Sequence, residues 1–489
     1  MENSTSTPAN GYTASEGKIH TWAVGYIANY WMIMQLMMIG AVFTTDFKMQ
    51  PWVVTTTLAV PRLIDIFVDP LIGHWSDNTH TSWGRRRPFL LGSAIIGAVA
   101  VFALWQMSPD WPTWGQSLYL GGVSTLLYMA YSTYEMCYYA LGYELSEDYG
   151  GRSKVMAIKG VYHAIAGMCG GFFYSSVMLW GKGVGEFKFF GYSWTLTTPH
   201  AFGNNITSIR YHSLVLVALI LLFGLAPVIF CRERYAQVNR KHVDLKEALL
   251  ATVKCRPFVL LMVLQLTRTL GYSLYQAFSF FIGVFYICQG NKLEWSNIMG
   301  GYTGVVGVGF SFLLWPLAKP LTNKLGKRMG IILGYGAALA QACLFPFIFK
   351  PGNVDVLFWV AVAYLPFGAV MGLFSNSVMP DICDIDELHY GERREGLFQA
   401  VQSFFNKAES WIVMLSSGFL LSLAGFDSKL DMQTPDTLRN MLWMGLTPLI
   451  FFTAVAFIIS WFLPFTPAYM AKIRAELSIK RESRAGMTA

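Results

Sequence analysis

Apolar runs of about 20 residues recur along most of this chain, and each is long enough to cross the hydrocarbon core of a bilayer as a helix. Charged residues make up only 13% of the 489 residues, whereas soluble domains average about 25%. The runs are continuous and lack the alternation of apolar and polar residues that marks lipid-facing strands. The sequence therefore predicts an all-α membrane protein with many transmembrane helices.

Twelve transmembrane segments fit these runs, and an even number places both termini on one side of the membrane. The segments are about 22–46, 51–76, 88–108, 116–143, 157–180, 211–231, 258–288, 297–318, 329–349, 356–380, 400–424 and 440–464. Of the 36 Lys and Arg residues, 24 fall in the terminal and even-numbered loops, 8 in the opposite loops and 4 within segments. Because positive residues accumulate in cytoplasmic loops, both termini are predicted to be cytoplasmic.

A basic linker divides the chain into two halves of six segments each. The expected regions are a polar N-terminus (1–21), a first bundle (22–231), the linker (232–257), a second bundle (258–464) and a cytoplasmic tail (465–489). The halves share a weak repeat, since Gly84-Arg85-Arg86-Arg87 follows segment two and Gly326-Lys327-Arg328 follows segment eight. Two six-helix halves repeated in this way predict the major-facilitator fold.

Three charged residues lie inside the second segment, where a charge at the bilayer centre costs about 2.5–3.5 kcal/mol. Arg62, Asp65 and Asp69 follow the i, i+3, i+7 spacing and share one helix face. Two carboxylates one turn apart supply the oxygen ligands that Na⁺ prefers, and buried carboxylates can also take up a proton. We predict a coupling-cation site at Asp65 and Asp69, and hence a transporter. The alternative is that Arg62 only neutralises an aspartate and locks helix packing.

The fourth segment holds a second candidate group, in the stretch from Tyr131 to Tyr139. A lone carboxylate among aromatic rings suits a sugar, because the acid accepts hydroxyl hydrogen bonds and a ring covers the apolar face of a pyranose. Glu135 and Tyr139 are therefore predicted substrate contacts, and Ser132 a further oxygen ligand for the cation. The alternative is an ion pair between Glu135 and a helix cation such as Lys159.

Other ionisable residues at membrane depth are Lys159, His163, Arg268, Lys407 and Glu409. His163 is one turn from Lys159 and is expected to be a satisfied core histidine rather than a proton relay. Lys407 can balance the charge of the aspartate pair when no cation is bound. Arg268 is assigned to the same charge network as Arg62.

Oppositely charged groups on the cytoplasmic side are candidates for a clamp between the halves. These groups are Asp77, Arg85 and Arg86 after segment two, and Asp381, Asp384, Arg393 and Arg394 after segment ten. Such pairs act as switches when they break in one state and form again in another. The alternative for the arginines is ordinary anchoring at the cytoplasmic surface.

The chain carries no sequence signature of an enzyme or of a nucleic-acid-binding protein. It has no P-loop, zinc spacing or nucleophile–base set, and its net charge of +7 is scattered over short loops. The 7 cysteines lie mostly in or near apolar runs and are expected to be ordinary core residues. We expect no cofactor beyond a coupling ion, no partner beyond substrate and lipid, and function as a monomer.

These residues resemble those of a known family, the glycoside–pentoside–hexuronide:cation symporters of the major facilitator superfamily. The resemblance spans most of the chain and is strongest in three groups. They are Arg62 to Pro70; Gly73 with Trp83-Gly84; and Asp381-Ile382-Cys383-Asp384, Tyr390-Gly391, Gln402-Ser403 and Lys407. The resemblance implies alternating access, sugar uptake driven by Na⁺, H⁺ or Li⁺, and a bacterial inner-membrane location.

The resemblance also implies roles for individual residues. The implied cation ligands are Asp65, Asp69 and Ser132. The implied substrate contacts are Glu135, in place of a family aspartate, and Lys159, Gln402, Ser403 and Lys407. Lys159 corresponds to a sugar-contacting arginine of the family only after a shift of one residue.

Two departures from the family leave the coupling ion and the kind of sugar undetermined. Val68 stands where the family's best-known member has an Asn that helps to hold Na⁺, so H⁺ coupling is an alternative. Asn29-Tyr30-Trp31 stands where that member has a Lys-Asp pair, so galactoside recognition does not carry over. The substrate can be a glycoside, a pentoside or a uronate. The other readings are a lysolipid transporter of the same fold and a non-transporting membrane sensor.

Overall fold

The structure of the chain is a computed structural model. It describes residues 14–79, 81–146, 149–189, 192–231, 252, 255–301, 307–355, 374, 378–388 and 395–488, with most of their side chains. The chain divides into two compact units. The first comprises Met1–Met49, Thr57–Gly185 and Thr195–Asn239, and the second comprises Gln50–Thr56, Glu186–Trp194 and Arg240–Ala489.

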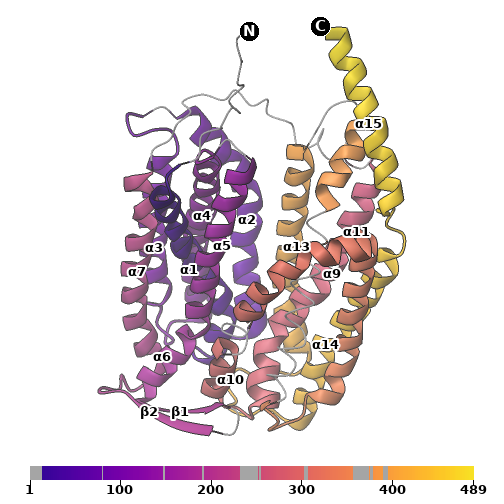
Figure 1. The fold of residues 1–489 in the computed structure, drawn as a ribbon. Helices are drawn as coiled ribbons and strands as arrows, with labels where there is room; N and C mark the ends of the chain where they lie inside the picture. Colours follow the sequence, from indigo (N-terminus) through magenta and orange to yellow (C-terminus); the bar gives the residue numbers. More distant parts are fainter. Residues whose placement is uncertain are drawn as a thin grey trace. The chain divides into compact units, whose positions relative to one another are not determined.

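The first half of the described chain is helical apart from one hairpin (Figure 1). Its helices are α1 (Glu16–Thr45), α2 (Pro51–Asn78), α3 (Arg87–Leu104), α4 (Thr113–Tyr143), α5 (Tyr149–Gly171), α6 (Phe173–Lys182) and α7 (Asn205–Phe230). The strands β1 (Val184–Phe189) and β2 (Tyr192–Thr197), which the sequence did not predict, pair as a two-stranded sheet. α5 and α6 together occupy predicted segment five.

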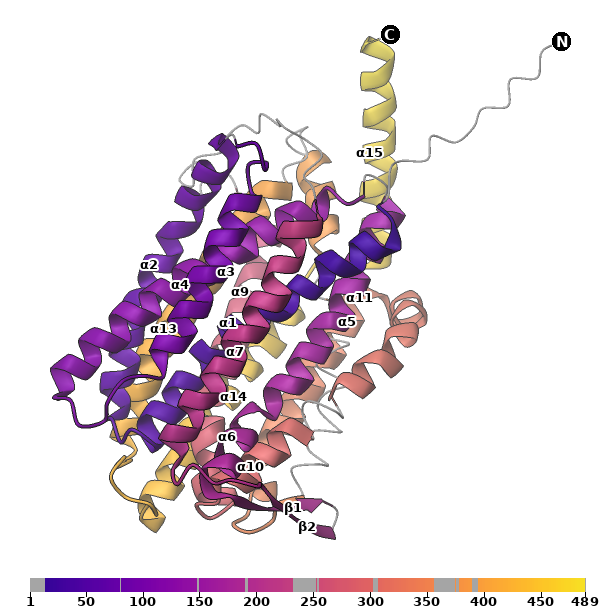
Figure 2. The same ribbon diagram turned by 90° about the vertical axis from the view of Figure 1, so that its left-hand side faces the viewer.

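Helix α1 is central to the packing of the first unit. It packs against α4, α5 and α7, while α3 packs against α4 and α7 (Figures 1 and 2). The α1–α7 contact is close because it uses glycines: a Cβ at Gly25 would lie 2.3 Å from Cγ of Pro227. The Tyr134 hydroxyl of α4 lies 3.2 Å from the carbonyl oxygen of Gly25 and 3.1 Å from that of Gly224. One buried hydroxyl therefore links three helices.

A glycine also permits the contact between α1 and the end of α4. Trp22 is fully buried and stacks on Tyr138, with ring centroids 4.6 Å apart. A Cβ at Gly142 would lie 2.1 Å from the Trp22 ring. We expect Gly142→Ala to lower the free energy of unfolding by about 1–3 kcal/mol, because the indole has to move within a filled core.

Thermal unfolding of the detergent-solubilised protein measures this effect. Gly122→Ala is the matched control, since it lies on the same helix and a Cβ there meets no atom within 4 Å. If both variants unfold at the same temperature, the packing argument for Gly142 is wrong.

The second half of the described chain is also helical. Its helices are α9 (Arg256–Phe281), the π-helix η1 (Ile282–Ile287), α10 (Lys292–Ile298), α11 (Gly307–Ile348), α13 (Glu395–Leu423), α14 (Pro435–Ser460) and α15 (Pro467–Thr488). α14 packs against α9 and α11, and α13 packs against α9. α11 is two helices joined at Gly326, whose φ of 72° is not helical. These two helices correspond to predicted segments eight and nine.

Two apolar clusters form the core of the second unit. One is built around Phe258, Tyr335 and Phe398, and the other around Phe278 and Phe345. Helix α15 contributes Met470 and Ile473 to the first cluster. The segment predicted as a cytoplasmic tail is therefore a helix with one side packed into the fold.

Eight helical stretches among the described residues are long and apolar enough to span a membrane. α4 and α13 are less apolar than these eight, and both carry polar residues predicted for the site.

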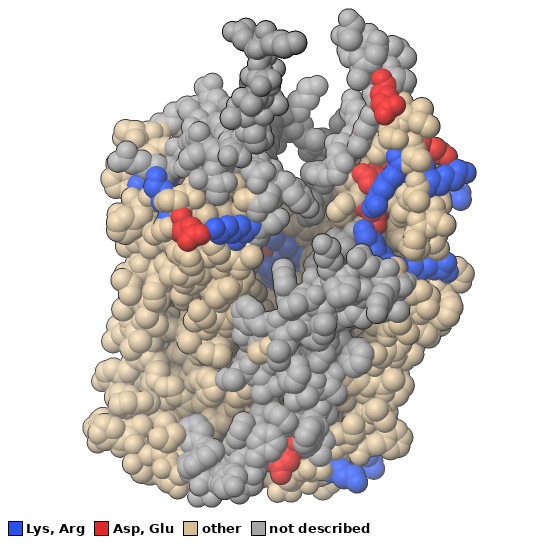
Figure 3. All heavy atoms as spheres, viewed as in Figure 1, with Lys and Arg blue, Asp and Glu red and all other residues tan. Residues whose placement is uncertain are grey.

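Predicted segment ten and the linker 232–257 lie largely outside the described residues. On the face in Figure 3, the described charged side chains lie mainly near helix ends, and uncharged surface covers most of the helix length. The chain is a multi-pass integral membrane protein.

Candidate functional site

The residues predicted for cation binding lie where α2 faces α4. Nη1 of Arg62 donates a hydrogen bond to Oδ2 of Asp65 at 2.8 Å, and Asp65 is 1% exposed. The Arg62 guanidinium lies 5.5 Å from the centroid of the Tyr128 ring. Ser132, one turn beyond Tyr128 on α4, is buried. Arg62 and Tyr128 thus connect α2 and α4, the helices that carry Asp65 and Ser132, while the side chain of Asp69 lies outside the described part of the structure.

Arg62 and Asp65 form an ion pair whose charges are largely buried, so the loss of either charge is costly. Two charges taken out of water are tolerated when each neutralises the other, and removing one partner is strongly unfavourable. A cation that binds Asp65 competes with Arg62 for the same carboxylate. The Arg62–Asp65 pair thus neutralises two charges within the fold, and the cation site at Asp65 stays a prediction.

Lys159 of α5 lies in an aromatic environment. Its Nζ donates a hydrogen bond to the Tyr139 hydroxyl at 2.8 Å, and lies 4.5 Å from the Tyr26 centroid and 4.8 Å from the Tyr139 centroid. Each cation–π contact of this kind contributes about 0.5–2 kcal/mol. The Lys159 ammonium is therefore held against two phenol rings and one phenol hydroxyl.

Glu135 is half-buried and shares a face of α4 with Tyr131 and Tyr139, four residues to either side. Its carboxylate interacts electrostatically with the hydroxyls of Tyr131, Tyr26 and Tyr139. α1, α4 and α5 therefore bring a carboxylate, an ammonium and several phenol groups together. Such a group can both donate and accept hydrogen bonds from a polyhydroxylated molecule.

His163 is not the core histidine that the sequence predicted, because its side chain is exposed. Its ring lies 5.0 Å from the ring of Tyr26 and 5.4 Å from that of Tyr30, measured between centroids. Sequence reasoning missed Tyr26 and Tyr30 as neighbours of this site. Their four-residue spacing on α1 was the available signal, but it does not reveal which helix they face.

The predicted residues of the second half lie on α13 and α9. Nε2 of Gln402 donates a hydrogen bond to Oε1 of Gln265 at 2.8 Å. Ser403 is exposed, whereas Lys407 and Arg268 are half-buried. The α9–α13 contact thus carries polar groups, and Gln265 is a member that sequence reasoning missed.

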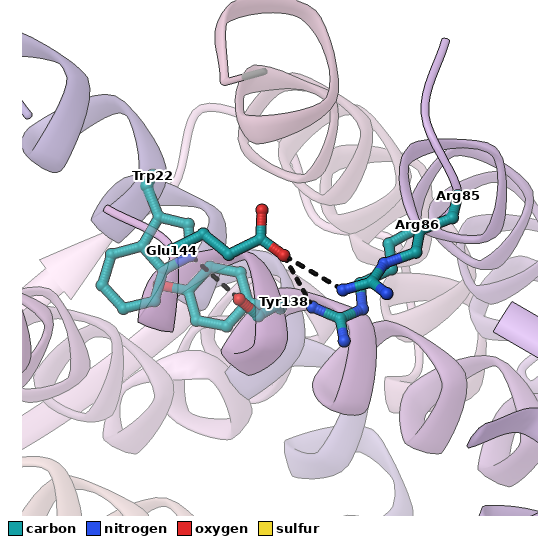
Figure 4. A network of polar contacts seen from close by, with 5 residues as sticks. All are labelled: Trp22, Arg85, Arg86, Tyr138 and Glu144. Carbon is teal, nitrogen blue, oxygen red and sulfur yellow. Dashed lines mark hydrogen bonds and ion pairs between the residues drawn. The ribbon is translucent and has the colours of Figure 1, made fainter. Parts of the chain in front are cut away.

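The basic loop after α2 is anchored within its own half (Figure 4). Nη2 of Arg85 and Nη1 of Arg86 both donate to Oε1 of Glu144, at 3.3 and 3.2 Å. Arg87 Nε donates to the carbonyl oxygen of Val228, near the end of α7, at 2.7 Å. The loop therefore joins the ends of α4 and α7.

The second half repeats this arrangement. Lys327 Nζ pairs with Oδ2 of Asp381 at 2.6 Å, and Nη2 of Arg328 donates to the carbonyl oxygen of Trp461 at 2.6 Å. In each half, then, one basic residue holds a carboxylate and the next holds a carbonyl at the end of the last bundle helix. The weak sequence repeat corresponds to the same set of contacts made twice.

The halves differ in the source of the second cation at the carboxylate. In the second half it comes from α15, where Nη2 of Arg474 pairs with Oδ1 of the buried Asp381 at 2.9 Å. We expect Arg474→Ala to lower the free energy of unfolding by about 1–2 kcal/mol, because a buried carboxylate loses a charge-assisted hydrogen bond.

Chemical denaturation of the purified protein measures the Arg474 effect. Lys472→Ala is the control on the same helix, since its 3.9 Å pair with Glu476 is exposed. Such an exposed pair contributes about 0.5 kcal/mol or less. If the two variants are equally stable, the Arg474–Asp381 pair contributes no more to stability than the exposed Lys472–Glu476 pair.

The residues predicted to clamp the halves thus have partners within their own half. Asp384 adds a 3.9 Å pair with Arg474. The side chain of Asp77, and Arg393 and Arg394, lie outside the described residues. A clamp between the halves stays a prediction.

Helices of bilayer length that bury an ion pair and gather a carboxylate and an ammonium are typical of a membrane transporter. The chain belongs to the family described as MFS/sugar transport protein, whose model matches residues 21–467. The resemblance to the glycoside–pentoside–hexuronide:cation symporters is thereby confirmed.

Two of the curated proteins that resemble the chain over most of its length are a symporter and a carrier homolog. An uncharacterized symporter of Synechocystis sp. is 23% identical, with 88% of this chain and 90% of the relative covered. A glucuronide carrier protein homolog of Escherichia coli is 24% identical, with 87% of each covered. Among solved structures, a proton-dependent oligopeptide transporter is 11% identical, with a TM-score of 0.62 over 94% of this chain and 100% of that chain. The prediction of an all-α major-facilitator fold is confirmed.

Proposed function

We propose that the chain is a secondary active symporter that couples uptake of a sugar or glycoside to Na⁺ or H⁺ by alternating access. The observation that carries the proposal is that one unit holds both the Arg62–Asp65 pair and the group of Glu135 and Lys159 with their tyrosines. Carboxylate, ammonium and phenol groups bind sugar hydroxyls, and the rings cover apolar sugar faces. The relatives named as a symporter and as a glucuronide carrier homolog support this choice.

In this proposal α4 couples the two ligands. Ser132, a proposed cation ligand, and Glu135, a proposed sugar ligand, are three residues apart on α4. Any shift of α4 that improves one set of contacts changes the other. Coupling between two binding equilibria is reciprocal, so a cation at Asp65 and Asp69 raises sugar affinity and sugar raises cation affinity by the same factor.

The proposal extends to the second half and to the membrane. Gln402, Ser403 and Lys407 of α13 are proposed as further substrate contacts. Both termini are proposed to be cytoplasmic in a bacterial inner membrane, because most basic residues lie in the terminal and even-numbered loops. The transporter is proposed to work as a monomer.

A lysolipid symporter is the second candidate, and one observation favours it. A cavity of about 480 Å³ opens between α3 and α4, with a mostly apolar lining that includes Phe89, Ile96, Leu126 and Met129. Ile96, Leu126 and Met129 are exposed large apolar side chains. Such a lateral cavity suits an acyl chain better than a sugar.

Uptake into proteoliposomes tests the proposal. Radiolabelled glycosides, pentosides and uronates are offered under an imposed Na⁺ gradient or an imposed pH gradient. Accumulation with Na⁺ alone identifies a sodium symporter, and accumulation with the pH gradient alone identifies a proton symporter. Absence of sugar accumulation, together with uptake of a lysolipid, would replace the proposal with the second candidate.

A further inference from the structure

A second polar and aromatic surface extends beyond Lys159 along α1 and α5, and the proposed function leaves it unused. His163 is exposed within a membrane helix, and its ring lies beside Tyr26 and Tyr30 at 5.0 and 5.4 Å. Within the described part of the chain its ring nitrogens make no hydrogen bond. An imidazole that is satisfied by packing would be buried and bonded, so this ring is open to a ligand.

Two glycines of α5 let the Tyr30 ring lie close to that helix, beside His163. A Cβ at Gly167 would lie 3.4 Å from the Tyr30 hydroxyl oxygen, and one at Gly170 would lie 3.1 Å from its Cε1. Larger residues at these positions would press on the ring. The Tyr30 ring thus lies directly on the α5 backbone, one to two turns beyond His163.

The exposed face that carries His163 is not the lipid face of α5. Val161 and Ile165 are 41% and 44% exposed and lie together on one apolar side. At about 100° per residue, His163 points about 160° away from both Val161 and Ile165. Lys159 shares the side of His163. The two faces have opposite chemistry, and the polar one continues the proposed sugar site.

We propose that Tyr30 and His163 form a subsite for a second sugar ring, so that the transported molecule is a glycoside of two rings. The first ring lies at Glu135, Tyr139 and Lys159, and the inference rests on that proposed site. From Lys159 to Gly167 the helix rises about 12 Å, which is longer than one pyranose and suits two linked rings. The imidazole nitrogens bond hydroxyls of the second ring, and the Tyr30 ring packs against its apolar face.

Binding of matched sugar pairs to the purified transporter tests the subsite. The probes are lactose, melibiose, cellobiose and maltose, each compared with the methyl glycoside of its non-reducing sugar. The variants are His163→Ala, Tyr30→Ala and His163→Phe, the last of which keeps an aromatic surface. Ile165→Ala, on the apolar face of the same helix, is the control for folding.

We expect at least one disaccharide to bind more tightly than its methyl glycoside. His163→Ala and Tyr30→Ala should weaken that disaccharide by about 3- to 10-fold and leave the methyl glycoside within about 2-fold. His163→Phe should recover part of the loss, and Ile165→Ala should change neither. Equal weakening of both members of a pair, or of neither, overturns the subsite while the sugar site stands. Failure of every sugar to bind the unmodified protein overturns the proposed function and this inference with it.

Discussion

The Asp65→Asn protein is expected to lose cation-driven sugar accumulation, with the internal-to-external sugar ratio falling to about one. Asp65 is 1% exposed and bonded to Arg62, so the amide removes the charge that would hold the coupling cation. Removing one partner of a buried pair costs about 3–5 kcal/mol of folding stability, so loss of accumulation has to be separated from loss of folding. The measurement is uptake into proteoliposomes under the gradient that drives the unmodified protein.

Two further variants separate coupling from folding. The double variant Arg62→Gln/Asp65→Asn removes both charges, so it should recover stability relative to Asp65→Asn but not accumulation. Asp110→Asn changes an exposed carboxylate in the loop before α4 and should accumulate sugar normally. Full accumulation by Asp65→Asn would show that this carboxylate is not part of the cation site, and Asp69→Asn would then be the next variant to examine.

Glu135→Gln is expected to weaken sugar binding by about 10- to 150-fold. The carboxylate lies among the hydroxyls of Tyr26, Tyr131 and Tyr139, where it can accept hydrogen bonds from a sugar. Hydrogen bonds to a charged group contribute about 1.5–3 kcal/mol, and each 1.4 kcal/mol is tenfold in affinity. Equilibrium binding of the transported sugar to the purified variant measures the change.

Two matched variants on α4 test whether the loss of affinity comes from the Glu135 charge. Glu135→Asp keeps the charge on a shorter side chain and should bind more tightly than Glu135→Gln. Thr133→Ala should bind like the unmodified protein, because the Thr133 hydroxyl is bonded to the Met129 carbonyl oxygen of its own helix. Unchanged affinity in Glu135→Gln would remove Glu135 from the substrate site and leave Lys159 as its charged member.

The membrane character of the chain and its major-facilitator fold followed from the sequence because a bilayer imposes a fixed length on each apolar helix. Charges at membrane depth are costly, so the few that occur, such as Asp65 and Glu135, were visible as candidates without coordinates. The repeat of a glycine followed by basic residues, at 84–87 and 326–328, could also be recognised from the sequence. These signals are local, since each depends on residues within one or two helical turns.

Contacts between side chains that are far apart in the chain could not be predicted from the sequence in this way. The sequence allowed Lys159 to pair with Glu135, but the structure places its ammonium against Tyr26 and Tyr139. It suggested a core role for His163, whose side chain is exposed. It also gave no sign that Arg474 would reach Asp381, because the two are far apart in the chain and α15 follows a predicted tail boundary.

Hydropathy and charge therefore determined how many membrane helices to expect, where they lie in the chain and which of them carry unusual charges. The tertiary structure alone decided which side chains meet, because helices of the same length and apolarity can pack in many rotations about their axes. At the α1–α4 and α1–α5 contacts, the glycines at 142, 167 and 170 leave room for Trp22 and Tyr30. Those close contacts restrict the rotation of the helices and so bring Tyr26, Glu135, Lys159 and His163 together in the proposed site.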